Sequence, residues 1–299
     1  MKKAFLFLSL FIVLSLACTL SVDVAPTISA TQAPTQIVEP PTTTPEIFIS
    51  LTQAMPATEI PTIAQSVEVS VPPLTVSLPT TLATGARGAQ IPRADGQDLP
   101  YFELTPGHTE LELEGYILQG KFHTPKIYVF PAMPYVELVP AAFESMHRLR
   151  NVMNPGATIT PDQLPGVPFF NAAQVFASNV QPITFQNGDG VRFLTEYAQY
   201  AAPVNNHELF YHFQGFSSDG EYYIIAILPV TAPVLAETSE AGAAIPAGGI
   251  VLPDINDPNA DWQGYYSAVT DLLNNTSPES FTPTLSQLDA LIQSMNVNP

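Results

Sequence analysis

The chain has 299 residues, one cysteine and a formal net charge of −18 at neutral pH, because 27 acidic residues face only 9 lysine and arginine residues. A single cysteine excludes an intramolecular disulfide, so an exported domain of this chain must rely on its hydrophobic core. The acidic balance excludes nucleic acid as a partner, since phosphate binding needs a basic surface, and it also disfavours contact with anionic lipid headgroups.

The amino-terminal residues have the three parts of a secretory signal. Lys2 and Lys3 form a basic start, an apolar run extends from Ala4 to Ala17, and Cys18 follows directly. The run is shorter than the roughly 20 residues that a membrane-spanning helix needs. Residues 1–17 are therefore predicted to be a signal peptide.

The segment from Leu14 to Cys18 resembles the lipobox of bacterial lipoproteins, with Ser15 and Leu16 in exchanged order relative to the usual pattern. The resemblance implies diacylation of the Cys18 sulfur, cleavage after Ala17 and acylation of the new amino terminus, with fatty acids such as palmitate. It also implies a location in the bacterial cell envelope. There the lipid on Cys18 would anchor the protein to the extracytoplasmic side of a membrane. The alternative is ordinary signal cleavage that leaves a free thiol.

Residues 18–95 are expected to form a lipidated, disordered linker. From Thr19 to Thr84 the chain is rich in Thr, Pro, Ala and Ser and contains no glycine and no basic residue. Repeated proline removes amide donors, so neither helix nor sheet propagates and the segment is expected to act as a stalk. Val67 to Leu78 alternates apolar and polar residues as an edge strand does, but Pro72 and Pro73 interrupt it, and we assign it to the stalk.

Residues 96–299 are expected to form the globular domain. Thr109 to Gln119 alternates leucines with glutamates, which predicts a strand with one face in water, and Lys126 to Phe130 predicts a second strand. Pro140 suits the first turn of a helix that ends at Asn154 to Gly156. The apolar stripe expected on this helix consists of Phe143, Met146, Leu149 and Met153.

The next segments predict an antiparallel meander. Gln174 to Ser178 and Gln181 to Gln186 are either two short strands or one strand broken at Pro182, and Asn187 to Gly190 is a hairpin signal. Three aromatic and β-branched strands follow, at Val191 to Tyr200, Glu208 to Phe216 and Glu221 to Val230. Tyr222 to Leu228 is apolar on both faces, which indicates a central strand covered on each side.

Two helices complete the domain, at Ala260 to Leu273 and Thr284 to Met295, with Asp261 and Thr284 as their caps. The predicted fold class is α+β, with an antiparallel sheet of five to six strands and helices packed on its faces. The order of elements resembles that of the photosystem PsbP and Mog1 type of domain. Val191 to Val230 is similar to segments of uncharacterised bacterial lipoproteins, and neither resemblance implies an activity.

His207, Glu208 and His212 spell His-Glu-x-x-x-His, one residue longer than the zinc-protease motif. That motif places both histidines on one face of a helix. Here His212 lies in a predicted strand, where the odd spacing sends the two side chains to opposite faces. We therefore expect ordinary histidines, no metal site and no cofactor.

The remaining polar motifs favour structural roles. Gly215 to Asp219 misses the serine-hydrolase elbow and lies at a predicted hairpin turn. His108, His123 and His147 have no spacing typical of a metal site or a catalytic triad. An acidic run offers oxygen ligands for calcium but lacks the glycine and glutamate of an EF-hand loop, so Asp261 is more simply a helix cap; the run consists of Asp254, Asn256, Asp257, Asn259 and Asp261.

The long loop from Thr231 to Pro258, followed by Trp262, Tyr265 and Tyr266, is the candidate partner-binding surface, because aromatic residues dominate binding hot spots. The alternative is that the loop is a connector and the aromatics pack their helix onto the sheet. We expect a membrane-tethered binding or assembly module of the cell envelope that meets an envelope protein or a small ligand. The alternative function is an extracytoplasmic hydrolase, which a cleft with His123 or His212 beside a carboxylate and a serine would favour.

Overall fold

The computed structural model describes residues 65–298 except residues 155, 158, 241 and 255. The predicted signal peptide, the lipidation site Cys18 and the linker up to residue 64 lie outside the described residues. The described residues form one compact unit. Within the described part, no helix is both long and apolar enough to cross a membrane.

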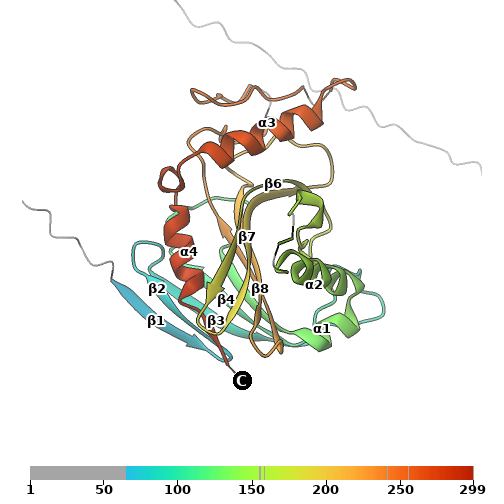
Figure 1. The fold of residues 1–299 in the computed structure, drawn as a ribbon, viewed down its shortest axis with the longest axis vertical. Coiled ribbons are helices and arrows are strands. Elements are labelled where there is room, and N and C mark those ends of the chain that lie inside the picture. Colours follow the sequence, from blue (N-terminus) through green and yellow to red (C-terminus); the bar gives the residue numbers. More distant parts are fainter. Residues whose placement is uncertain (1–64, 155, 158, 241, 255, 299) are drawn as a thin grey trace, which may run out of the picture. The chain divides into compact units, whose positions relative to one another are not determined.

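Two antiparallel sheets form the framework (Figure 1). A seven-stranded sheet has the order β3-β4-β5-β9-β8-β7-β6, and a three-stranded sheet has the order β1-β2-β10. The strands are β1 (Ser66–Val71), β2 (Leu74–Pro79), β3 (Gly85–Ile91), β4 (His108–Glu114), β5 (Lys126–Pro131), β6 (Ala173–Phe185), β7 (Gly188–Ala198), β8 (Phe210–Ser217), β9 (Tyr222–Pro229) and β10 (Asn296–Val297).

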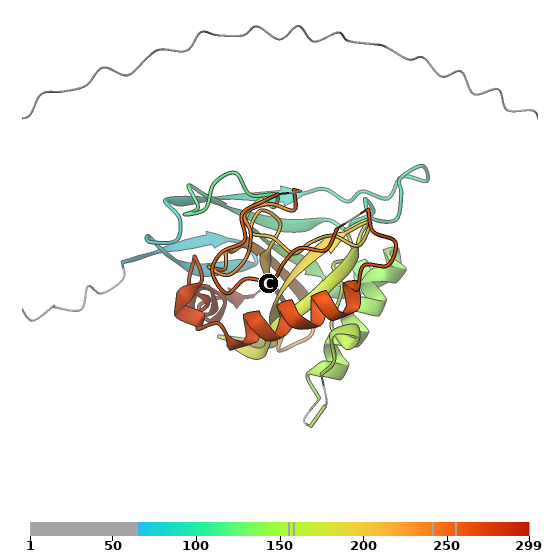
Figure 2. The same cartoon turned by 90° about the horizontal axis from the view of Figure 1, so that it is seen from above.

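In the described part of the chain, four α-helices pack on the seven-stranded sheet. They are α1 (Ala132–Leu138), α2 (Pro140–Val152), α3 (Trp262–Asn275) and α4 (Leu285–Gln293), with short 3-10 turns at η1 (Pro161–Gln163) and η2 (Pro278–Ser280). Figure 1 shows α4 and α2 on opposite sides of strands β7 and β8, and Figure 2 shows α3, in orange, running across the domain when it is seen from above. The α+β class with an antiparallel sheet and packed helices is confirmed, but the predicted strand number of five to six is too low.

The predicted boundary of the stalk is wrong, because strands β1, β2 and β3 lie inside residues 18–95. Pro72 and Pro73 do not interrupt a strand. They form the turn of a hairpin in which Val71 pairs with Leu74, where proline is well tolerated. Strand β2 buries its alternate apolar side chains against the core, so the folded part begins near Ser66 and not near Gly96.

Strand β9 is the fourth of seven strands, as its apolar sequence predicts. Its side chains alternate between two cores. Ile224 and Ala226 belong to the core that α3 and α4 cover, whereas Tyr223 and Ile225 belong to the core under α1 and α2. Each core buries residues from many strands, so together they hold both faces of the sheet.

The β6–β7 hairpin differs in detail from the prediction. Strand β6 is continuous through Pro182, and its register shifts instead lie at Gln174/Phe176 and Ser178/Gln181. Phe185 pairs with Gly188, so the turn consists of Gln186 and Asn187, and the glycines expected in it belong to β7.

The sequence predicts the ends of the helices more accurately than it predicts their buried faces. Pro140 is at the first turn of α2, Asp261 caps α3, and Thr284 forms a capping box with Gln287 at the start of α4. Phe143 does not belong to the buried stripe of α2, because it is 54% exposed. The buried residues of this helix are Ala142, Ser145, Met146, Leu149 and Val152.

Candidate functional site

A cavity of about 480 Å³, which we call the aromatic groove, opens at one end of the seven-stranded sheet. Its walls come from segments that meet at this end because adjacent strands run antiparallel: the connection into β5, the segment before β6, the end of β7 and the segment before β8. The lining residues are Phe102, Phe122, His123, Phe169, Phe170, Asn171, Ala172, Tyr197, Ala198, Gln199, Tyr200 and Glu208.

Large apolar side chains at the mouth of the groove are exposed. Phe122 is 64% exposed and Tyr200 is 58% exposed. Exposed rings that rim a concave site are a characteristic of binding surfaces, since they gain most when a ligand removes them from water. A neighbouring hollow shares Tyr200 with the groove and extends to Tyr101 and Tyr266.

His123 forms part of the wall and is held by aromatic contacts. Its ring stacks on Phe170 with 5.3 Å between centroids and 12° between planes, and it meets the edge of Phe210 at 4.5 Å. Burial, with a smaller effect from His207, lowers the pKa of His123 to about 4. The ring is therefore neutral at pH 7 and adds a weakly polar surface to the groove.

Two carboxyl groups lie beside each other at the groove. Glu208 lines it and is half-buried, and Glu196 of β7 lies behind and is fully buried. Burial raises the pKa of Glu196 well above its usual range, and the charge of Glu208 raises it further. Both effects favour the protonated form of Glu196, since two adjacent carboxylates are unfavourable in a poorly solvated place.

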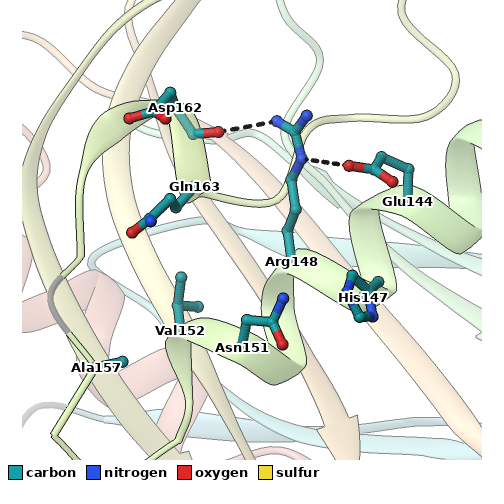
Figure 3. A pocket seen from close by; sticks show the side chains of 8 residues that line it. All are labelled: Glu144, His147, Arg148, Asn151, Val152, Ala157, Asp162 and Gln163. Atoms are coloured by element: carbon teal, nitrogen blue, oxygen red, sulfur yellow. Dashed lines mark hydrogen bonds and ion pairs between the residues drawn. The ribbon is translucent and has the colours of Figure 1, made fainter.

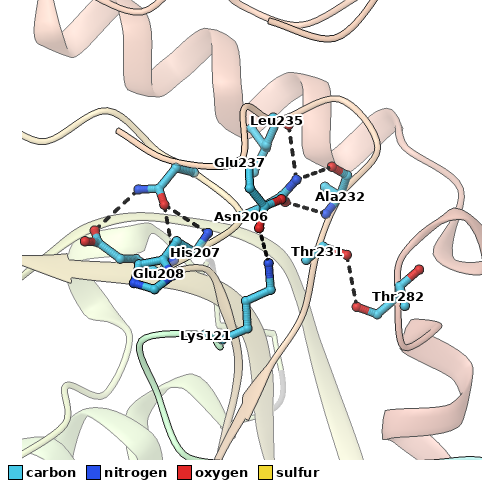
Figure 4. Close-up of polar contacts among 10 residues, drawn as sticks. Lys121, Asn206, His207, Glu208, Thr231, Ala232, Leu235, Glu237 and Thr282 are labelled. Atoms are coloured by element: carbon cyan, nitrogen blue, oxygen red, sulfur yellow. Dashed lines mark hydrogen bonds and ion pairs between the residues drawn. The ribbon is translucent and has the colours of Figure 1, made fainter. Parts of the chain in front are cut away.

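Asn205 holds this pair in place. Its backbone amide donates to Glu196 Oε2 at 3.1 Å, and its side-chain amide lies 3.4 Å from both Glu196 Oε2 and Glu208 Oε2. Its side-chain oxygen accepts from the backbone amides of His207 and Glu208 at 3.0 and 3.2 Å. Figure 4 shows Glu208 and His207 on this short turn. One oxygen of the pair, Glu196 Oε1, has no hydrogen-bond partner among the described residues.

The groove is better suited to binding than to nucleophilic catalysis. Among its lining residues, all of which are described, there is no serine, threonine or cysteine and no lysine or arginine. Within the described part of the chain, no group of three or more histidine, cysteine, aspartate or glutamate side chains is arranged to hold a metal ion. The groups that the aromatic groove offers to a ligand are aromatic faces, a neutral imidazole and a carboxylate.

The loop predicted to bind a partner, residues 231–258, is held to the domain near its start by hydrogen bonds and a salt bridge. Asn206 donates to the carbonyl oxygens of Ala232 and Leu235 at 3.1 Å, and the backbone amide of Ala232 donates to Asn206 Oδ1 at 2.8 Å (Figure 4). Lys121 forms a salt bridge with Glu237 (Figure 4).

The three aromatic residues after this loop have different positions. Tyr265 is 6% exposed, and its hydroxyl accepts a hydrogen bond from the backbone amide of Val204 at 3.0 Å. Trp262 and Tyr266 are half-buried, and Tyr266 donates to the carbonyl oxygen of Ala202 at 3.1 Å. Tyr265 therefore packs α3 onto the domain, whereas Tyr266 also lines the hollow next to the aromatic groove.

The other histidines do not meet in one site. His207 lies in the turn before β8, and His212 is fully buried within β8, where burial lowers its pKa to about 3. His108 is buried, and its Nδ1 lies 2.9 Å from the carbonyl oxygen of Pro106. His147 is exposed on α2.

A second hollow lies between α2 and the segment around η1 (Figure 3). Arg148 crosses it, with its Nε 3.0 Å from Glu144 and its terminal nitrogen donating to the carbonyl oxygen of Asp162 at 3.1 Å. His147 also lines this hollow. Because Arg148 is already bound to groups of the protein, the hollow offers a ligand less than the aromatic groove does.

The remaining predicted motifs are local structures. Ser217 donates to Asp219 at 2.5 Å in the turn between β8 and β9, and no histidine joins them. In the acidic run, Asp254 and Asp257 accept from backbone amides two residues further on, and Asp261 caps α3 by accepting from Gly264. These contacts are the turn and cap roles that the sequence favours.

Sequence reasoning singled out His123 and Glu208 but not their proximity, and it missed Phe122, Tyr200 and Glu196. A usable signal was present at Glu196, which is a charged residue at a core-facing position of a strand with strong apolar character. The chain matches no family model, and no curated protein or solved structure is significantly similar to it.

Proposed function

We propose that the protein is a membrane-tethered, extracytoplasmic lipoprotein that acts as a binding or assembly module of the cell envelope, with the aromatic groove as its ligand site. The observation that carries the binding role is the groove itself, a concave site rimmed by exposed rings of Phe122 and Tyr200. Its volume of about 480 Å³ is in the range of small-ligand sites. The tether rests on the lipobox-like segment that ends at Cys18.

The tether is tested by metabolic labelling with palmitate and by partition into detergent. Two or more acyl chains anchor a protein stably, at about 0.8 kcal/mol per buried methylene. We expect the mature protein to carry label and to enter the detergent phase, and we expect Cys18→Ser to abolish both. Equal labelling of the Cys18→Ser protein would contradict the lipoprotein assignment.

The groove is tested with N-phenyl-1-naphthylamine, a neutral aromatic probe whose fluorescence rises in apolar surroundings. The chain without residues 1–18 is suitable, because all of the described residues are retained and no acyl chain competes for the probe. We expect the double change Phe122→Ala, Tyr200→Ala to weaken binding by about tenfold or more, since each lost ring contact contributes about 0.5–1.5 kcal/mol.

The matched control is Phe143→Ala, which removes an equally exposed ring from α2, outside the groove. The proposal requires unchanged probe binding in this variant. Saturable binding that the groove variant retains in full would place the ligand site elsewhere.

The hydrolase alternative has one observation in its favour, because His123 and Glu208 line the same groove. The serine that a histidine–carboxylate pair would activate is missing from the lining, and His123 has its pKa lowered to about 4, which makes it a weak base. Binding therefore accounts for the groove with fewer assumptions.

A further inference from the structure

The aromatic groove combines rings with a carboxylate, and its surroundings contain no spare positive charge. Glu208 is the one lining residue with a charge at neutral pH, because His123 is neutral there. The nearby Lys121 is paired with Glu237. A ligand that enters the groove therefore meets a negative site.

The rest of the domain strengthens this negative potential. Every described lysine and arginine except Arg150 forms an ion pair within the protein, as at Arg93 with Asp95 and Lys126 with Glu110. Arg150 lies over the ring of Phe216, with 5.0 Å from its guanidinium carbon to the ring centroid. The surplus acidic residues are left without an internal counter-charge, and a net charge of −18 attracts cations over the whole surface.

Glu196, the buried neighbour of Glu208, gives a second reason to expect a positively charged ligand. Glu196 carries an oxygen with no hydrogen-bond partner among the described residues, and it is held next to Glu208 by Asn205. A positive group against Glu208 would offset the negative charge that Glu208 carries next to the poorly solvated Glu196. Electron-rich faces of Phe122 and Tyr200 would attract the same group through cation–π contacts.

Resting on the proposed binding function, we infer that the aromatic groove recognises a cationic organic ligand, in which an ammonium group is attached to an apolar or aromatic body. The ammonium lies against Glu208, and the body lies among the rings of Phe122, Phe170 and Tyr200. The groove discriminates against anionic ligands with the same body, because their charge would face Glu208 across a poorly solvated site.

Three probes with a common phenylbutyl body separate charge from shape: 4-phenylbutylamine, which is an ammonium ion at pH 7, neutral 4-phenylbutanol and anionic 4-phenylbutyrate. Their affinities for the chain without residues 1–18 are measured by calorimetry or by displacement of N-phenyl-1-naphthylamine. We expect the ammonium ion to bind at least fivefold more tightly than the alcohol and the carboxylate to bind most weakly. We expect the preference for the ammonium ion to shrink as salt is added.

Glu208→Gln tests the assigned residue, because it keeps the shape and removes the charge. We expect this variant to bind the ammonium ion and the alcohol with equal affinity, and to bind the alcohol as the unchanged protein does. The matched control is Glu221→Gln, an exposed glutamate directly before β9, in the turn at the far end of β8, roughly 30 Å along the strand from Glu208. This control should keep the full preference.

The outcomes distinguish this inference from the binding function on which it rests. If all three probes bind equally and lose affinity in the Phe122→Ala, Tyr200→Ala variant, the groove is a binding site but not a cationic one. Tighter binding of the carboxylate, or a preference that survives Glu208→Gln, would overturn the inference in the same way. If neither these probes nor N-phenyl-1-naphthylamine binds, the proposed binding function fails as well.

Discussion

Two charged residues on the same face of β7 have opposite surroundings. Arg192 and Glu196 are four residues apart, so both point to the side of the sheet that carries α3 and α4. Arg192 is 4% exposed and meets Asp289 with two contacts of 3.1 Å, and it also donates to Gln181 at 2.7 Å. Glu196 is equally buried but faces another glutamate.

Arg192 therefore stabilises the fold, whereas the burial of Glu196 costs folding free energy. The Arg192–Asp289 pair ties β7 to α4, and Tyr211 adds a hydrogen bond to Asp289 at 2.8 Å. Burial and the neighbouring Glu208 disfavour the ionised form of Glu196, and Glu208 lines the aromatic groove. A carboxyl group whose pKa is strongly raised by burial and by a like charge is typical of functional sites, which is why we connect this pair with ligand binding.

The largest effect on stability is expected at Arg192, whose charge is paired with Asp289. Arg192→Met removes one partner of a buried ion pair and leaves Asp289 without its counter-charge, which costs about 3–5 kcal/mol of unfolding free energy. Urea unfolding measures this loss. The control is Arg87→Met, because Arg87 is 65% exposed in its pair with Glu112 and such pairs contribute about 1 kcal/mol or less. Equal losses in the two variants would contradict the structural role of Arg192.

The second effect is acid destabilisation through His212. Its pKa is lowered to about 3 in the folded protein, mainly by burial, whereas an unfolded histidine titrates near 6.5. The unfolded state therefore takes up the proton first, and stability falls as pH decreases from about 6.5 towards 3. We expect roughly 3 kcal/mol to be lost by pH 4, with a contribution of the same sign from His123, whose folded pKa is about 4.

Unfolding free energies measured between pH 7 and pH 4 check this slope. His212→Gln should flatten it, whereas His147→Gln should leave it unchanged, because His147 is exposed on α2. A slope that His212→Gln does not alter would show that this histidine is charged or solvated in the folded protein.

The smallest effect has the opposite sign and comes from Glu196. Its raised pKa means that the folded protein keeps a proton that the unfolded chain loses near pH 4.5, so this residue lowers stability as pH rises above that value. Glu196→Gln provides a neutral hydrogen-bond donor to Glu208, and we expect a gain of about 1–3 kcal/mol at pH 7. The gain should vanish below pH 4, and a loss at pH 7 would contradict the raised pKa of Glu196.

Local signals in the sequence predict much of this fold. The apolar strand β9 lies at the centre of the sheet, and Thr284 and Gln287 form the capping box of α4, because these features depend on short stretches of chain. Strands β1 and β2 are not predicted, because Pro72 and Pro73 have the pattern of an interrupted strand. Their place in a hairpin turn depends on pairing that composition does not reveal.

The candidate site could not be predicted to the same extent. Its walls come from five segments separated by many residues, and the tertiary fold brings them together. The same holds under α2, where Ser145 lies 2.9 Å from both Gln214 and Tyr223 in a buried polar cluster. Such clusters depend on which side chains meet across the sheet, and periodicity indicates only the face on which each one lies.

The central claim is that a cationic ligand binds next to Glu208, whose buried neighbour Glu196 has a raised pKa. Its most direct test is carbon-13 NMR of the glutamate side chains across a pH titration. The account predicts that the Glu196 carboxyl titrates well above pH 4.5 and that 4-phenylbutylammonium shifts its pKa downward, because a nearby cation favours the ionised form. The carboxyl signal of Glu221 should not respond to the ammonium ion. A Glu196 carboxyl that titrates near 4.5 and does not respond to the ammonium ion would contradict the account.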